Sequence, residues 1–77
     1  MAERERLSPY PNPAKDAFTL NSKVSGHLTV YTTSGQAVQT QAYTPGDKTD
    51  ISSLTPGLYL YRFTSGRGVR TGKVVKE

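Results

Sequence analysis

The chain of 77 residues contains no cysteine, no tryptophan and a single histidine, His27. The lack of cysteine excludes a disulfide framework, a Cys-ligated zinc site and a thiol nucleophile, and one histidine is too few for a two-histidine metal motif. No stretch approaches the roughly 18 continuous apolar residues of a membrane-spanning helix, so we expect no direct membrane insertion. With 34% hydrophobic residues, a chain of this length has enough apolar side chains for one small domain.

The first six residues, Met-Ala-Glu-Arg-Glu-Arg, are mostly charged and do not resemble an export signal. We therefore expect residues 1–8 to be the remnant of a linker, or a start added for expression, and the domain to occupy residues 9–77. On this interpretation the sequence is a fragment of a longer precursor.

Glycine-bearing turn signals divide the chain into short segments. Gly26, Gly35, Gly46, Gly57 and Gly66 follow one another at intervals of 9, 11, 11 and 9 residues. Short segments bounded by such turns are typical of an all-β sandwich or barrel, and they leave no room for helices. We expect six or seven antiparallel strands joined by tight loops, including a short strand near residues 7–10.

Alternation of apolar residues with a period of two predicts the individual strands. In the clearest segment, 57–63, Tyr59, Tyr61 and Phe63 alternate with two leucines and an arginine. Because this segment is apolar on nearly both faces, we expect it to be central in a sheet. Weaker patterns predict strands at 17–21, 26–33, 36–43 and 69–76, and a short edge strand at 50–52.

Prolines 9, 11 and 13 restrict the backbone ahead of the first full strand. We interpret this stretch as a rigid lead-in from the linker. Asn12, which precedes a proline, is expected to form a local turn between its side chain and the nearby backbone.

The net charge of +4 is concentrated near the C-terminus, at Arg62, Arg67, Arg70, Lys73 and Lys76. Positive charge attracts polyanions in general. A nucleic-acid-binding barrel would interleave aromatic and basic residues on an exposed face, whereas the aromatic residues here lie on a strand that we expect to be buried. Nucleic acid is therefore not an expected partner.

No arrangement of residues indicates catalysis. His27 has no evident partners for a nucleophilic triad, and the Ser-Gly-Arg-Gly stretch at 65–68 lacks the Lys-Ser/Thr ending of a phosphate-binding loop. We expect no enzymatic activity, no catalytic residue, no cofactor and no metal.

Four blocks of the sequence, taken together, resemble a known family. They are YPNPA at 10–14 followed by Phe18-Thr-Leu20, LTVYTTSG at 28–35 with Val38, LTPGLY at 54–59, and GKVVK at 72–76. In this order and spacing they are similar to the type A C-terminal sorting domains of the type IX (Por) secretion system, over residues 10–77. Tyr61 and Phe63 depart from the family pattern, in which smaller aliphatic residues are usual, and Gly72 interrupts the last strand.

The resemblance implies an Ig-like antiparallel β-sandwich that serves as a C-terminal secretion signal in a Gram-negative bacterium. It implies that an N-terminal cargo passes through the periplasm, crosses the outer membrane and reaches the cell surface or the medium. The implied partners are the outer-membrane translocon and its shuttle proteins, and a cell-surface sortase that removes the domain. The alternative function is a stand-alone adhesive or carbohydrate-binding β-sandwich of a secreted protein.

A signal of this kind needs an exposed recognition element rather than a pocket. The candidate residues form a C-terminal segment and a second patch at a strand start: Lys73, Val74, Val75, Lys76 and Glu77, and Gly57, Leu58 and Tyr59. The terminal strand would also offer backbone pairing to a receptor sheet. An unpaired edge strand, at 50–52 or at the end of the chain, would permit dimerisation of the isolated domain.

Overall fold

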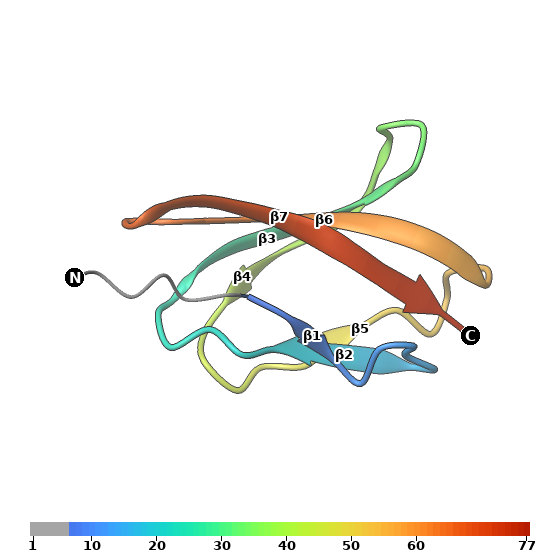
Figure 1. The fold of residues 1–77 in the computed structure, drawn as a ribbon, viewed down its shortest axis with the longest axis horizontal. Helices are drawn as coiled ribbons and strands as arrows, with labels where there is room; N and C mark the ends of the chain where they lie inside the picture. The colour runs from blue at the N-terminus through green and yellow to red at the C-terminus, as the bar shows by residue number, and fades with distance from the viewer. Residues whose placement is uncertain (1–6) are drawn as a thin grey trace.

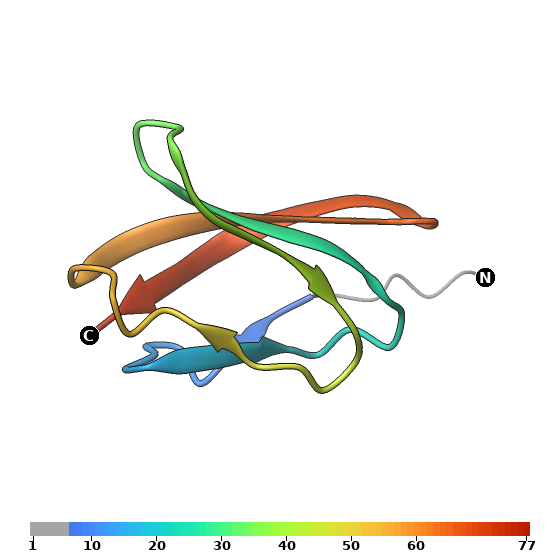
Figure 2. The same cartoon turned by 180° about the vertical axis from the view of Figure 1, so that it is seen from behind.

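Seven strands arranged in two antiparallel sheets form the domain in the computed structural model, which describes residues 7–77 (Figure 1). The smaller sheet has the order β1-β2-β5 and comprises β1 (Pro9–Tyr10), β2 (Ala17–Leu20) and β5 (Thr49–Asp50). The larger sheet has the order β4-β3-β6-β7 and comprises β3 (Gly26–Thr32), β4 (Ala37–Tyr43), β6 (Gly57–Ser65) and β7 (Gly68–Lys76). Seen from the front and from behind, the sheets are two facing layers (Figures 1 and 2). The predicted small β-sandwich is confirmed.

The strand β6 is central, as predicted, because it lies between β3 and β7. Its two faces differ. Tyr59, Tyr61 and Phe63 are buried between the sheets, whereas Leu58 on the other face is 43% exposed. The leucine face is thus an outer surface of the larger sheet, although its apolar character favoured burial.

The short segments also have the predicted roles, with shifted limits. The N-terminal strand is the two-residue β1, and the expected edge strand at 50–52 is β5 at Thr49–Asp50, which lies at the edge of the smaller sheet. The C-terminal strand β7 is an edge strand of the larger sheet.

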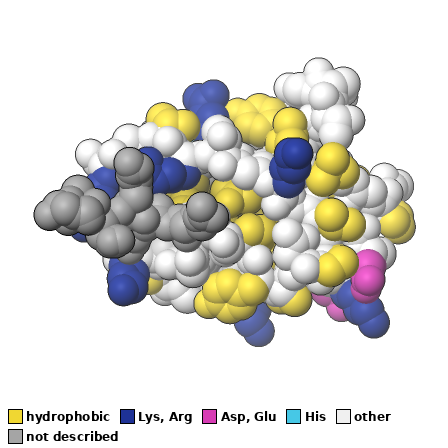
Figure 3. Space-filling model, in the orientation of Figure 1, with side chains coloured by type: hydrophobic (Ala, Val, Ile, Leu, Met, Phe, Trp, Pro, Cys, Tyr) yellow, Lys and Arg dark blue, Asp and Glu magenta, His cyan; other side chains and the backbone are white. Residues whose placement is uncertain are grey.

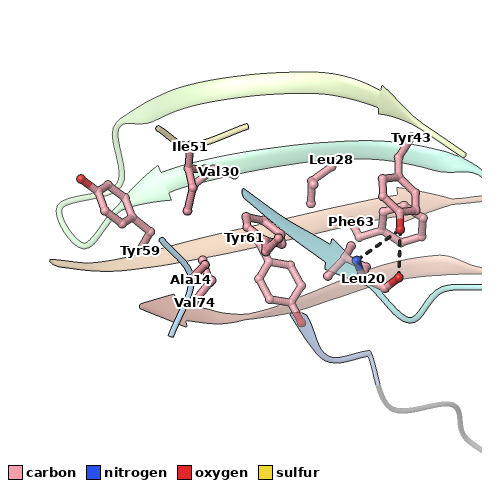
Figure 4. Packing of buried hydrophobic residues seen from close by; sticks show 11 residues of the cluster. Ala14, Leu20, Leu28, Val30, Tyr43, Ile51, Tyr59, Tyr61, Phe63 and Val74 are labelled. Atoms are coloured by element: carbon pink, nitrogen blue, oxygen red, sulfur yellow. Dashed lines mark hydrogen bonds between the residues drawn. The ribbon is translucent and has the colours of Figure 1, made fainter. Parts of the chain in front are cut away.

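The core lies between the two layers (Figure 4). Its buried hydrophobic residues are Ala14, Phe18, Leu20, Leu28, Val30, Tyr43, Ile51, Tyr59, Tyr61, Phe63 and Val74. The Tyr43 hydroxyl donates a hydrogen bond to the Leu20 carbonyl oxygen (2.9 Å) and accepts one from the Leu20 amide (3.2 Å). The ring of Tyr43 also packs edge-on against Phe63, with 5.6 Å between centroids. Tyr43 therefore joins the larger sheet, through its own strand β4, to the smaller sheet.

The turn between β4 and β5 is fixed by Asp47. Its Oδ2 accepts hydrogen bonds from the Thr44 amide (2.9 Å) and the Thr44 hydroxyl (2.8 Å). These two bonds favour the charged carboxylate, so the pKa of Asp47 lies below its ordinary value. Gly46 supplies the left-handed conformation that this turn requires, with φ of 92°.

Candidate functional site

The two segments that the sequence singled out lie side by side on β6 and β7. Gly57 pairs with Lys76, Leu58 with Val75, and Tyr59 with Val74. Residues separated by 15 to 19 positions in the sequence are thus brought into direct cross-strand contact. The second patch and the C-terminal segment form one continuous surface element.

Strand alternation divides this element between the two faces of the sheet. Leu58 and Val75 point outwards and are 43% and 38% exposed, whereas Val74 has no exposed surface. Tyr59 and Lys76 also face inwards and are buried. The expectation of an exposed recognition element is therefore wrong for the side chains of Val74 and Lys76, because their faces pack towards the smaller sheet. Tyr59 was a candidate recognition residue on a strand expected to be buried, and its side chain lies in the core.

Lys76 is a buried charged residue, with 9% of its surface exposed. Its Nζ donates a hydrogen bond to the Glu77 carbonyl oxygen at 3.3 Å, so the charge reaches the surface at the end of the strand while the stem stays covered. Among residues 7–77, Glu77 and Lys73 are the charged members of the C-terminal segment that remain exposed.

The end of β7 is held by the proline-rich segment that precedes β2. The Val75 amide donates a hydrogen bond to Asn12 Oδ1 (3.0 Å), and the Val75 carbonyl oxygen accepts one from the Ala14 amide (2.8 Å). The Glu77 amide donates to the Ala14 carbonyl oxygen (2.8 Å), and Ala14 is fully buried. We call Asn12 and Ala14 the N-terminal clamp. It closes the edge of β7 at its C-terminal end.

The predicted local turn at Asn12 is wrong, because its side chain bonds to a residue 63 positions away. Neither member of the N-terminal clamp was identified as a site residue from the sequence. The one signal that pointed to them was their place within the YPNPA block, since no local pattern reveals a partner so distant in the chain. The sequence predicted that the terminal strand would offer its backbone to a receptor sheet. The clamp removes the last residues of β7 from that role, because Val75 and Glu77 already have backbone hydrogen-bond partners.

The outward side chains of β3, β6 and β7 form an apolar surface, which we call the outer patch. Its members are Tyr31, Leu58, Leu60, Lys73 and Val75. Cross-strand pairing places Leu60 between Tyr31 and Lys73, in the row next to the pair formed by Leu58 and Val75. A shallow groove of about 270 Å³ lies on this face beside Leu58 and Val75, and its lining includes Tyr31, Leu60 and Lys73 of the outer patch together with Arg62 and Thr71. In Figure 3, hydrophobic side chains gather over the C-terminal half of β7.

The charge on the larger sheet is of one sign. Its four strands contain no aspartate or glutamate, and its cations are Arg62, Arg70, Lys73 and Lys76. Arg62 and Lys73 border the groove. The outer patch thus combines exposed aliphatic side chains with positive charge, and it suits contact with a protein surface that offers apolar and acidic groups.

The buried phenol of Tyr61 lies below this surface, on the inner face of β6. Its hydroxyl donates a hydrogen bond to the Leu7 carbonyl oxygen at 3.2 Å. Burial raises its pKa above the ordinary value, and burial does the same for Tyr43. Both phenols are therefore neutral structural groups at physiological pH.

Residues 7–77 bring together no three His, Cys, Asp or Glu side chains in an arrangement that would hold a metal ion. No helix within residues 7–77 has the length and apolar character required to cross a membrane.

Comparison with known proteins identifies the family of this domain. The family model described as "Secretion system C-terminal sorting domain" matches residues 8–77. No curated protein and no solved structure matches the chain. The matched region includes the N-terminal clamp, the outer patch and the C-terminal segment.

Proposed function

Because the chain belongs to the family of type IX secretion system C-terminal sorting domains, we propose that it acts as an address that is recognised, and not as a catalyst. A sorting signal of this family interacts with the secretion machinery and is part of a protein that is exported to the cell surface or secreted. In the proposed role, the domain directs an N-terminal cargo from the periplasm across the outer membrane. Its receptors are the translocon and the shuttle proteins that serve it.

One observation supports this role above the others. Two family blocks that are distant in the sequence, LTPGLY and GKVVK, meet on adjacent strands and display Leu58 and Val75 outwards as a pair. Leu58 and Val75 are not part of the buried core cluster, and a pair of exposed aliphatic side chains beside Lys73 suits specific contact with a protein. Recognition by the outer patch needs no bound ligand and no moving part.

The proposed sequence of events ends with removal of the domain by a cell-surface sortase. The cut would fall in the segment before the sandwich, within residues 2–8. All but the last two of these residues lie outside the described part of the chain, as does most of the predicted linker at 1–8.

The experiment fuses residues 1–77, which include the proposed cleavage segment, to a periplasm-directed reporter in a strain that has the machinery, and measures the fraction of reporter at the surface and in the medium. The informative variant carries Leu58→Thr and Val75→Thr, which remove apolar groups but keep residues that suit strands. The matched control is Val38→Thr on β4, where the valine is similarly exposed at 37%. We expect the double variant to lower export about tenfold, which corresponds to about 1.4 kcal/mol of lost binding.

The proposal is contradicted when the unaltered domain leaves the reporter in the periplasm. Export of the double variant at the level of the control would place recognition away from the outer patch. Removal of Lys76 and Glu77 tests the C-terminal segment separately, because this deletion leaves Leu58 and Val75 in place. Intact mass measurement of the exported reporter tests cleavage: the sortase step predicts a product that lacks the sandwich.

A further inference from the structure

The outer edge of β7 has two halves. We call residues 75–77 the closed half, because their backbone is hydrogen-bonded to the N-terminal clamp, and residues 69–73 the open half. At the closed half, the N-terminal clamp bonds to the backbone of Val75 and Glu77 on the side away from β6. The backbone N–H and C=O groups of alternate residues point to the same side of a strand, and the pairing of β6 with β7 shows no register shift. Val69, Thr71 and Lys73 therefore direct their backbone groups to the same edge as Val75.

No strand or loop within residues 7–77 pairs with this open half. The larger sheet ends at β7, and the bridge from Ala14 reaches only Lys76. Val69, Thr71 and Lys73 are all exposed, and Val69 is exposed at 52%. An unpaired edge of this kind is a template for another strand.

The charges around the open half determine which charge an added strand must carry. Arg70 and Lys73 lie on it, Arg62 lies on the neighbouring strand and Arg67 lies in the adjoining hairpin turn. No carboxylate is present on any strand of this sheet. Like charges on neighbouring strands oppose pairing and opposite charges favour it.

A second copy of the chain is a poor occupant, because pairing β7 with another β7 would bring two sets of Arg70 and Lys73 together. An extended segment that carries aspartate or glutamate is better suited to pair with this edge. It gains the backbone hydrogen bonds of the edge and meets the four cations. The same cations disfavour the edge-to-edge dimer that the sequence permitted.

We infer that an acidic extended segment of the secretion machinery adds to the open half of β7, from Val69 to Lys73, as a fifth strand of the larger sheet. This inference rests on the proposed function and identifies the chemistry of its partner. It also gives the N-terminal clamp a role, since the clamp occupies the closed half and confines strand addition to the open half.

The experiment uses the same reporter fusion with Thr71→Pro and, as its matched control, Thr71→Ala. Proline removes the one outward N–H at this position and is tolerated at the edge of a sheet, whereas alanine shortens the side chain and keeps the N–H. We expect Thr71→Pro to lower export about fivefold relative to Thr71→Ala, the factor that one lost hydrogen bond makes. Thermal unfolding of the purified 77-residue variants establishes that both are folded.

A charge variant provides a second route if the proline variant does not fold. Arg70→Glu reverses one charge on the open half and leaves the outer patch intact, and Lys15→Glu, before β2, is its control. Lower export with Arg70→Glu alone supports acidic strand addition. Equal export of folded Thr71→Pro and Thr71→Ala, or of Arg70→Glu and Lys15→Glu, overturns it. A reporter that stays in the periplasm with the unaltered domain contradicts the proposed function instead.

Discussion

Tyr61 on β6 lies directly opposite Gly72 on β7, and its ring fills the space that a side chain on residue 72 would occupy. A Cβ placed on Gly72 would lie 2.5 Å from the Tyr61 Oη and 2.6 Å from the ring carbon that bears it. Tyr61 is a core residue of β6 that reaches towards the N-terminal end of the described chain (Figure 4). The aromatic residue and the glycine, each a departure from the family pattern, are therefore complementary.

A second aromatic residue of β6 also packs against a glycine on a neighbouring strand. A Cβ on Gly26 would lie 2.8 Å from the tip of the Phe63 ring, and it would clash with the Thr64 carbonyl oxygen. The large aromatic side chains of β6 fit the sandwich because glycines on both neighbouring strands leave room for them. Gly72 thus permits dense packing in the last strand and does not interrupt it.

Gly72→Ala should destabilise the domain by about 1–3 kcal/mol, because the added methyl group forces Tyr61 or the backbone to move in a filled core. Urea unfolding measures the change. Gly66→Ala is the matched control, since no atom lies near a Cβ at this turn position, and its effect should stay within about 0.5 kcal/mol.

The double variant Tyr61→Leu/Gly72→Ala tests whether this cost comes from the pair. Its loss of stability should be smaller than the sum of the two single losses, by about 0.5–3 kcal/mol of coupling. Strict additivity would show that Gly72 is required for another reason.

Tyr43→Phe should cost about 1–3 kcal/mol, because it removes the hydroxyl that serves both the Leu20 amide and the Leu20 carbonyl oxygen inside the core. The ring contact with Phe63 is kept. Tyr31→Phe is the control, because its side chain lies on the outer face of the sheet and its hydroxyl has no hydrogen-bond partner within residues 7–77. Equal unfolding midpoints for the two variants would show that this link between the sheets adds no stability.

Stability should fall as the pH rises above about 10, the ordinary pKa of tyrosine. Burial raises the pKa of Tyr43 and Tyr61 in the folded state, so the unfolded chain releases these protons first. The unfolded state then binds fewer protons than the folded state, and the free energy of unfolding decreases with pH. Urea midpoints between about pH 8 and pH 11 measure the decline, which should be shallower in Tyr43→Phe than in Tyr31→Phe.

Asn12→Ala should loosen the end of β7 while the rest of the sheet stays closed. The variant removes the acceptor of the Val75 amide, whose hydrogen bond lies at the sheet edge. Hydrogen exchange should accelerate at Val75 and, to a lesser degree, at Glu77, with the amides of β3 as internal controls. Unchanged protection at Val75 would show that the backbone of Ala14 is sufficient to hold the strand end.

The sequence predicted the β-sandwich because its signals are local. Glycine-bearing turns and period-two alternation arise within single segments, so the strands of the larger sheet, the central position of β6 and the short edge strand β5 follow from residues close together in the chain. The four blocks of family resemblance likewise identified the secretion signal and the two segments that meet on β6 and β7.

Only the tertiary structure decided which side of each strand faces the core and what lies beside its edge. Alternation separates Val74 from Val75 but does not show which of them is buried, because that depends on where the smaller sheet packs. The sequence also gave no indication that Asn12 would bond to Val75 or that Tyr61 would need Gly72. Such contacts join residues far apart in the chain, and they exist only once strand register and layer packing have brought the two backbones together.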